Sequence, residues 1–312
     1  MTRYIAHRLV TTIPVMGIVA LIVFAMIRLT GDPAAILAGD TASSDQIDAL
    51  RRSMGLDKPL YVQLALWIGQ LVRGDLGVSL VSQVPVTKII AERLGPTLAL
   101  TVGTIIVSVV IAVFMGVVAA RKHGSLLDRG VMAFSVFGFS VPAFITGYIL
   151  IELFAIWLGV LPVQGYKPLS DGIGPFLSHL VLPVITLSAS YIALIARISR
   201  TSVLEVIQED FIRTARSKGL DERGVLMHHA LRNAAVPIVT VIGTGVAVLI
   251  GGVVVTESVF NIPGLGRLVV ESVLARNYPV IQGLVLFFSF FYIIINLAID
   301  VLYTVIDPRI RY

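Results

Sequence analysis

Six long apolar runs restrict this chain to a membrane-spanning, helical fold. They cover about residues 9–29, 97–120, 131–158, 176–198, 235–256 and 280–304. Each supplies the ~20 residues that a helix needs to cross the hydrocarbon core of a bilayer. Charged residues make up only 14% of the 312-residue chain, against roughly 25% in soluble proteins. The sequence therefore predicts an all-α polytopic membrane protein with six transmembrane helices.

Basic residues predict the orientation of these helices. If the N-terminus is cytoplasmic, the inside loops hold 14 of the 24 Lys and Arg residues: Arg3, Arg8, Arg121, Lys122, Arg129, Arg197, Arg200, Arg213, Arg216, Lys218, Arg223, Arg232, Arg309 and Arg311. Cytoplasmic loops are enriched in Lys and Arg, so we expect both termini on the cytoplasmic side of the plasma membrane. The net charge of +5 is then an orientation signal and does not indicate nucleic-acid binding. A cleaved signal peptide is the alternative for the N-terminus, but the apolar run there is longer than the hydrophobic region of a typical signal peptide.

Residues 31–95 are polar and carry helix signals without a membrane span. Ser43 and Gln46 fit a capping box, and Pro85 can open a short helix that ends at Gly95-Pro96. We expect a small extracytoplasmic subdomain of short helices rather than a floppy linker. The expected domain order is an N-terminal segment with the first span at 1–30, this subdomain at 31–95, a transmembrane core at 96–304 and a cytoplasmic tail at 305–312.

The basic stretch 197–237, between the fourth and fifth spans, reads as two short helices joined by a turn. Four apolar residues recur every four positions and are expected on one face of the first helix: Val203, Ile207, Phe211 and Ala215. Gly219 follows that helix, where a left-handed cap favours glycine, and Asp221 can cap the second helix. The alternative is an amphipathic connector whose basic residues lie on anionic lipid.

Polar residues inside the spans are few. Glu152 lies in the third span and Asp300 near the inner end of the sixth, and intramembrane carboxylates are functional candidates by default. Glu152 can instead hydrogen-bond across the bundle, and Asp300 can pair with a cytoplasmic arginine. Four uncharged residues could line a path, or could satisfy one another or the backbone: Ser188, Tyr191, Thr240 and Thr244.

The outside loop at 257–279 contains two closely spaced glycines. They resemble a phosphate-binding loop only weakly, because no strand precedes them. A short helix from about Leu268 to Ala275, returning to the membrane at Pro279, fits the sequence better. Such a helix could pack over the outer end of the bundle as part of a gate, with these candidates: Pro263, Gly264, Gly266 and Leu268.

Several separated phrases together resemble one protein family. They are RYIAHRLVTTIPV followed by GDPA, GLDKPL, FIRTARSKGL with HALRNAAVP, VFNIPGLGRLVVESVLARNYPVIQG, and DVLYTVIDPRIRY. They resemble the membrane permeases of dipeptide, oligopeptide, glutathione and nickel ABC importers, in particular their first permease subunit. The stretch 199–234 resembles the cytoplasmic EAA coupling loop of such permeases. Its Gly219 and Pro237 match, whereas Thr214-Ala215-Arg216 stands where the family signature has Glu-Ala-Ala.

The resemblance implies a type I importer permease that forms a heterodimer with a paralogous second permease. It also implies two cytoplasmic ATPase domains, an extracytoplasmic substrate-binding protein, and movement of the coupling loop as the ATPases close. The residues that would contact the ATPase are Asp210, Phe211, Arg213, Thr214, Ala215, Arg216 and Gly219. The expected cargo is a peptide, such as a dipeptide, an oligopeptide or glutathione, with nickel or another small solute as the alternative.

Catalytic, cofactor and metal sites are not expected in this chain itself. It has no Cys and no G-x-x-x-x-G-K-[S/T] phosphate loop, so ATP and Mg²⁺ would be used by the partner ATPases. A secondary transporter is a rival class, but such proteins usually contain internal repeats, and no clear repeat is present. A membrane-embedded enzyme is the other rival, and the isolated Glu152 and Asp300 do not form a reactive cluster. We expect a non-enzymatic permease subunit.

Overall fold

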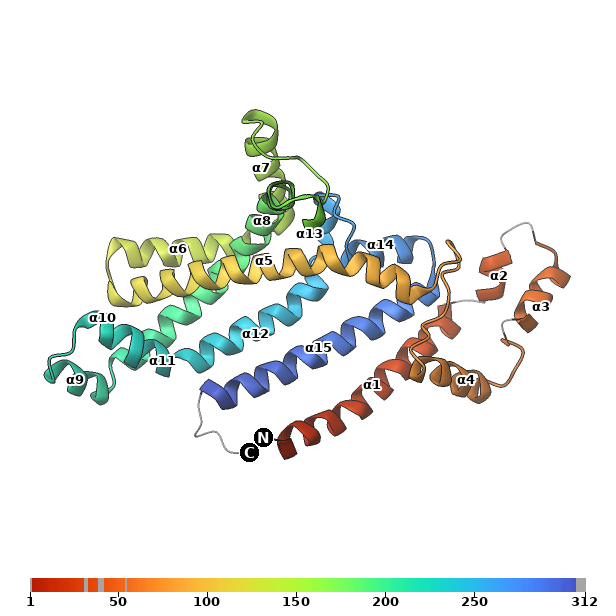
Figure 1. Cartoon of the computed structure of the whole chain (residues 1–312), viewed down its shortest axis with the longest axis horizontal. Helices are drawn as coiled ribbons and strands as arrows, with labels where there is room; N and C mark the ends of the chain where they lie inside the picture. The colour runs from red at the N-terminus through yellow and green to blue at the C-terminus, as the bar shows by residue number, and fades with distance from the viewer. Residues whose placement is uncertain (1, 31–32, 39–41, 54, 307–312) are drawn as a thin grey trace. The chain divides into compact units, whose positions relative to one another are not determined.

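The computed structural model describes residues 2–30, 33–38, 42–53 and 55–306, and these residues are almost entirely helical (Figure 1). Their β-structure is limited to one isolated antiparallel bridge between Val78 and Pro85. Most of the predicted tail at 305–312 lies outside the described residues. The chain divides into two compact units, Met1–Leu94 with Arg267–Ile293 and Gly95–Gly266 with Ile294–Tyr312, and each is described by itself below.

The first unit contains the N-terminal helices and parts of three later helices. They are α1 (Thr2–Thr30), α2 (Pro33–Ala38), α3 (Ser44–Ser53) and α4 (Leu60–Val72), with parts of α5 (Val86–Arg121), α14 (Leu265–Leu274) and α15 (Tyr278–Ile306). The predicted capping box is confirmed at the start of α3. The Ser43 N–H donates to Gln46 Oε1 at 3.0 Å, and the Gln46 N–H donates to Ser43 Oγ at 3.4 Å.

A buried polar contact fixes the loop before α5 within this unit. Asn277 is 6% exposed and lies between α14 and α15. Its Oδ1 accepts from the Leu80 N–H at 3.0 Å, and its Nδ2 donates to Ser79 Oγ at 2.8 Å. Because buried polar groups are costly unless they are hydrogen-bonded, these two bonds hold the loop at 79–80 against the turn between α14 and α15.

The second unit contains the remaining helices. They are α6 (Leu126–Ser140), α7 (Ala143–Leu150), the π-helix η1 (Ile151–Trp157), the 3₁₀-helix η2 (Leu169–Asp171), α8 (Ile173–Ile207), α9 (Asp210–Ser217), α10 (Glu222–Gly224), the π-helix η3 (Val225–Ala230), α11 (Leu231–Asn233), α12 (Ala235–Gly252) and α13 (Val254–Val259). Apolar side chains of α5, α8, α12 and α13 form one buried cluster, which includes Leu100, Leu187, Leu249 and Val259.

Three described helices are long and apolar enough to cross a membrane on their own. They are Val86–Arg121, Ile173–Ile207 and Tyr278–Tyr303, and two bent pairs of helices raise the number of candidate spans to five. The first predicted span falls in α1, whose described apolar part, Thr11–Met26, is shorter than a full span. The all-helical membrane fold is therefore confirmed, whereas the number of six spans stays a prediction.

The prediction that a helix ends at Gly95-Pro96 is wrong, because α5 continues through this pair to Arg121. Proline lacks an N–H and normally interrupts a helix. In membrane helices, however, proline is tolerated because neighbouring groups can satisfy the freed backbone carbonyl. The second predicted span is thus the C-terminal part of a longer helix that begins at Val86.

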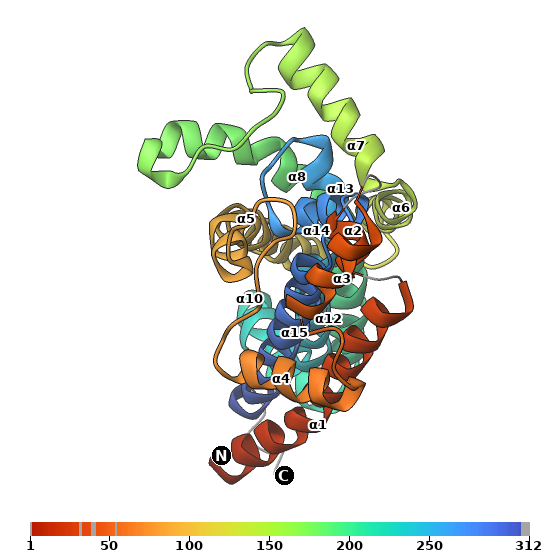
Figure 2. The same ribbon diagram turned by 90° about the vertical axis from the view of Figure 1, so that its right-hand side faces the viewer.

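The third predicted span is broken rather than straight. Its two parts, Leu126–Ser140 and Ala143–Trp157, are bent by 101°, and α7 diverges from the axis of α6 in both views (Figures 1 and 2). The break lies at Val141, which has φ −82° and ψ 121°, directly before Pro142. The residue before a proline is disfavoured in the α region, which explains why the helix stops here.

Gly116 allows a close approach between α5 and α8. A Cβ on this residue would lie 2.5 Å from Ser199 Cβ and 2.8 Å from the Ala196 carbonyl oxygen. Gly130 of α6 is the matched contrast, since a Cβ there would meet no heavy atom within 4 Å.

We predict that alanine has opposite effects at these two helical glycines. Gly130→Ala should raise the stability by about 0.5–1 kcal/mol, because alanine is the better helix former. Gly116→Ala should lower it by about 1–3 kcal/mol through overpacking. The thermal unfolding midpoint of the purified full-length protein in detergent measures both effects. If Gly116→Ala raises the midpoint as well, α5 and α8 are not in close contact at this position.

Candidate functional site

The loop between α8 and α12 is built from two helical arms, as the sequence predicts. The first arm is α9, and the second is the consecutive helical segment α10, η3 and α11, which runs from Glu222 to Asn233. Asp221 is the N-cap residue of the second arm, with extended backbone angles, but its side chain makes no capping hydrogen bond. The second arm meets α12 at a bend of 59°.

Gly219 forms the turn between the two arms. Its φ is +80°, a conformation that glycine adopts readily and β-branched residues adopt only with strain. The Gly219 N–H donates to the Arg216 carbonyl at 3.0 Å, and the Leu220 N–H donates to the Ala215 carbonyl at 3.4 Å. This pair of bonds is the Schellman motif. The predicted left-handed cap is thus present at Gly219.

The predicted apolar face of the first helix is wrong in its register. Because α8 ends at Ile207 and α9 begins at Asp210, the four-residue period does not run through one helix. Ile212 and Ala215 are instead the buried residues of α9, whereas Phe211 is 42% exposed. Ile212 and Ala215 belong to an apolar cluster that we call the loop core: Ala120, Val203, Ile212, Ala215, Val225, Ala230, Ala234 and Ile238.

An ion pair closes the turn between the two arms. Arg216 Nη2 donates to Glu222 Oε1 at 2.8 Å, and Arg216 Nε donates to Glu222 Oε2 at 3.2 Å. The hydrogen bonds to Glu222 raise the pKa of Arg216 above its ordinary value. Arg213 makes a looser contact with Asp210 at 3.4 Å, and both side chains are largely exposed. The exposed surface of α9 therefore carries Asp210, Phe211, Arg213 and Thr214.

A second ion pair lies near the same end of α8, and the sequence alone did not single it out. Asp128 of α6 is 3% exposed and accepts two hydrogen bonds from Arg200 of α8. The bond from Arg200 Nη2 to Asp128 Oδ2 measures 2.8 Å. The Gly124 N–H also donates to Asp128 Oδ2 at 2.9 Å. A bidentate arginine–carboxylate pair fixes geometry as well as charge. The pair joins two helices that are far apart in sequence, which is why no local pattern indicated it.

The four path candidates do not form one surface. Ser188 is 1% exposed and donates to the Thr104 carbonyl of α5 at 3.5 Å. Tyr191 and Thr244 line a common cavity of about 250 Å³ with Phe139, Ser190, Leu194 and Gly245. Thr240 is exposed and accepts a hydrogen bond from the Tyr303 hydroxyl at 2.8 Å. Only Tyr191 and Thr244 are therefore brought together.

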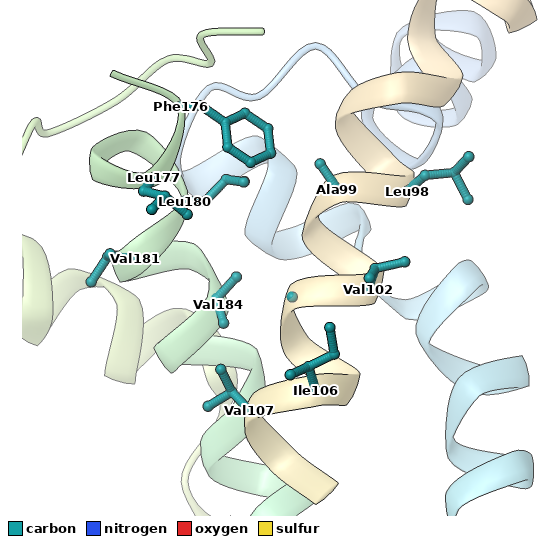
Figure 3. Close-up of a pocket in the computed structure, with 11 residues that line it drawn as sticks. Leu98, Ala99, Val102, Ile106, Val107, Phe176, Leu177, Leu180, Val181 and Val184 are labelled. Atoms are coloured by element: carbon teal, nitrogen blue, oxygen red, sulfur yellow. The ribbon is translucent and has the colours of Figure 1, made fainter. Parts of the chain in front are cut away.

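A larger groove lies between α5 and α8 and is entirely apolar (Figure 3). It has a volume of about 540 Å³ and is lined by Leu98, Ala99, Val102, Gly103, Ile106, Val107, Phe176, Leu177, Leu180, Val181 and Val184. Within this lining Gly103 lies close to Val184, since a Cβ on Gly103 would lie 3.0 Å from Val184 Cγ2. No polar side chain lines the groove, so it offers no hydrogen bond to a polar solute.

A buried carboxylate organises the gate candidates of the second unit. Glu257 of α13 is fully buried, and its Oε1 accepts from the Thr97 hydroxyl of α5 at 2.6 Å. The Thr97 hydroxyl in turn accepts from the Leu265 N–H at 2.8 Å. Gly264 packs directly against the Glu257 carboxylate, where no side chain would fit. Glu257 was not among the residues predicted from the sequence, although a carboxylate beside a long apolar run was the available signal.

The other gate candidates have different surroundings. A Cβ on Gly266 would lie 2.8 Å from the Val254 backbone nitrogen, so this glycine allows the start of α14 to approach α13. Pro263 is half-buried, and Leu268 is buried within the first unit. The predicted outer helix is present as α14, three residues earlier than expected.

The two predicted intramembrane carboxylates lie on two other helical segments, η1 and α15. Glu152 is exposed on η1, beyond the bend that breaks the third span, and Asp300 is half-buried on α15. Within the described part of the chain, no three His, Cys, Asp or Glu side chains gather closely enough to hold a metal ion.

Comparison with known protein families shows to which family the chain belongs. The family "Binding-protein-dependent transport system inner membrane component" matches residues 112–312, and the family "Binding-prot-dependent transport system membrane comp, N-term" matches residues 1–101. The chain belongs to the binding-protein-dependent inner-membrane permeases. It is therefore an integral inner-membrane protein and a permease subunit of an ABC importer.

Two curated relatives match this permease along its whole length. One is the probable peptide ABC transporter permease protein y4tP of Sinorhizobium fredii, which is 50% identical over 310 residues and 99% of each chain. Another is the glutathione transport system permease protein GsiC of Escherichia coli strain K12, which is 44% identical over 313 residues and all of both chains. In the inward-facing MetNI methionine ABC transporter, one chain aligns with a TM-score of 0.59 and 19% identity, covering 71% of this permease and 97% of that chain. This last likeness confirms the fold.

We predict that the Arg216–Glu222 pair of this permease can be reversed as a unit. Both side chains are 40% exposed, so the pair should contribute only about 0.5 kcal/mol to local stability. Arg216→Glu alone should speed amide hydrogen exchange in α9, because two carboxylates then face each other across the turn. The double change Arg216→Glu with Glu222→Arg should restore the slower exchange. Equal exchange in the single and double variants would show that the pair does not brace the turn.

Proposed function

We propose that this permease imports peptides, such as dipeptides, oligopeptides or glutathione. The full-length relatives named as peptide and glutathione permeases support this cargo class. The alternative, nickel or another small solute, would use the same architecture. A secondary transporter or a membrane enzyme finds no support in the family match.

The proposal for coupling rests on one observation, the braced and exposed first arm of the loop. The buried side of α9 is held by Ile212 and Ala215, while Phe211 remains exposed beside the charged residues Asp210 and Arg213. An aromatic residue within a polar rim is typical of a docking surface. We assign Asp210, Phe211, Arg213, Thr214, Ala215, Arg216 and Gly219 to the contact with an ATPase, in which Ala215 acts from within the loop core.

The loop core could transmit a movement of the loop to the membrane helices. Its side chains come from α5, α8 and α12 as well as from the loop, so a displacement of α9 would act on three helices together. Closure of two ATPases would push this loop and that of the partner permease towards each other. The bundle would then open outward to receive cargo from the binding protein, with Tyr191 and Thr244 on its path and the segment at Pro263, Gly264, Gly266 and Leu268 as its outer gate.

The complete transporter would contain a paralogous second permease, two cytoplasmic ATPase domains and an extracytoplasmic substrate-binding protein. This permease would be non-catalytic, because ATP and Mg²⁺ require a phosphate-binding loop that its sequence does not contain. Reversal of the charge at Arg213 would mainly slow assembly with the ATPases, since exposed charges increase the rate of docking more than they stabilise the docked complex.

We also propose an orientation and a domain order. Residues 31–95 would form an extracytoplasmic subdomain, 96–304 the transmembrane core, and both termini would be cytoplasmic. A cysteine at Ser44 should then react with an impermeant thiol reagent from outside, and a cysteine at Ser217 only from inside. The chain has no Cys of its own, so no background labelling arises from it. Labelling of both positions from one side would overturn the orientation.

The decisive variant for coupling is Gly219→Val. A valine at φ +80° is strained by about 1–2 kcal/mol, and a Cβ at this position meets no heavy atom within 4 Å, so the effect arises from the backbone. Membrane levels should stay near normal because the apolar spans decide insertion. ATP-driven peptide uptake by reconstituted vesicles should fall, and the ATPases should dissociate or hydrolyse ATP without transport.

Gly124→Val is the matched control for this experiment. Gly124 has φ +77° and equally open surroundings, but it lies in the other predicted cytoplasmic loop, before α6. Its substitution should impose the same backbone strain while leaving uptake coupled to ATP. Normal uptake by Gly219→Val, with the ATPases still bound, would instead favour a loop that only rests on the membrane surface.

A further inference from the structure

A second groove, confined to the first unit, combines apolar walls with one cationic side chain. It has a volume of about 300 Å³ and is lined by Val23, Met26, Val273, Arg276, Tyr278, Ile281, Gln282 and Val285. Gln282 Nε2 donates to the Val23 carbonyl at 3.5 Å, which links α1 to α15 at the groove. We propose that this groove binds one phospholipid with an anionic headgroup.

Arg276 is the only charged residue that lines the groove. It is exposed, and within the described part of the chain its guanidinium makes no ion pair or hydrogen bond. An arginine presents a planar set of donors that matches the oxygens of a phosphate group. An unpaired guanidinium beside an apolar surface therefore complements a molecule that has a phosphate at one end and hydrocarbon behind it.

The backbone at Arg276 supports a specific need for this side chain. Arg276 has φ +51° and occupies the left-handed position after α14, where glycine is strongly preferred. The Arg276 N–H donates to the Val273 carbonyl at 3.1 Å, and the Asn277 N–H donates to the Ser272 carbonyl at 2.8 Å. The turn would form more easily with glycine, so an arginine in this strained conformation points to a function of its side chain.

The position of Arg276 along the chain places it at the level of lipid headgroups. The apolar helix α15 begins at Tyr278, two residues after Arg276, and tyrosine is enriched at membrane–water interfaces. Ile281 and Val285 follow along the same groove, one and two turns further into the span. The lipid phosphate would contact Arg276, and an acyl chain would lie along Val23, Ile281 and Val285.

The test uses the assembled transporter in nanodiscs and a photoreactive phosphatidylglycerol, with photoreactive phosphatidylcholine as the neutral comparison. The wild-type chain should capture phosphatidylglycerol on α15 in preference to phosphatidylcholine. Arg276→Gly should lower this capture by about fivefold, the effect expected for one cationic residue near an anionic surface. Because glycine suits φ +51°, this variant should fold at least as well as the wild type. Arg276→Lys should retain most of the capture.

Two further variants separate the groove from general surface charge. Arg73→Gly removes an exposed arginine that does not line the groove, and it should leave capture unchanged. Val285→Phe narrows the groove while Arg276 remains, and it should also lower capture. The proposal is overturned if wild-type protein captures both lipids equally or if Arg276→Gly has no effect. It is also overturned if soluble glycerol phosphate displaces the lipid. A fourth outcome against it is that Val285→Phe disrupts transporter assembly without changing lipid capture, because the groove would then bind a protein partner.

Discussion

Packing of α9 onto the ends of three other helices is the contact on which the account of this permease depends. Ile212 is fully buried in the loop core, and burial of a side chain of this size contributes about 1.5–3 kcal/mol. Gly219 sets the angle at which the second arm continues, and Arg216 with Glu222 braces the turn. The loop is therefore held as a folded element, whose exposed side is free to meet another protein.

Around Glu257, a polar network is added to the apolar packing of the second unit, where Leu100, Val259 and Phe260 are buried. Glu257 is fully buried, and Thr97 links it to the backbone of Leu265. A buried carboxylate is costly unless its hydrogen bonds are made, so α5, α13 and the start of α14 are coupled through one side chain. Such a hydrogen-bonded network has few alternative arrangements, because each donor must keep an acceptor at a suitable distance and angle. Both parts of the second unit thus have an apolar core, and the part around Glu257 also has a buried polar network.

The sequence predicted the features that depend on local patterns. The capping box at Ser43, the left-handed Gly219 and the outer helix before Pro279 follow from backbone chemistry over a few residues, and each is present. The register of the loop was predicted wrongly, because the break at Gln208 and Glu209 carries no proline or glycine signal. The pairs Asp128–Arg200 and Thr97–Glu257 join residues that are 72 and 160 positions apart. Such contacts arise only from the packing of whole helices, so no local pattern could indicate them.

The claim that α9 docks onto an ATPase is tested most directly by contact mapping in the assembled transporter. A photoreactive amino acid is placed at Phe211, which is 42% exposed, or at Leu126, which is 84% exposed and lies within the predicted cytoplasmic loop at 121–130. The account predicts that the probe at Phe211 crosslinks to an ATPase subunit in high yield and that the probe at Leu126 does not, despite its greater exposure. Crosslinking of Phe211 to lipid alone, or equal capture of the ATPase at both positions, would contradict it.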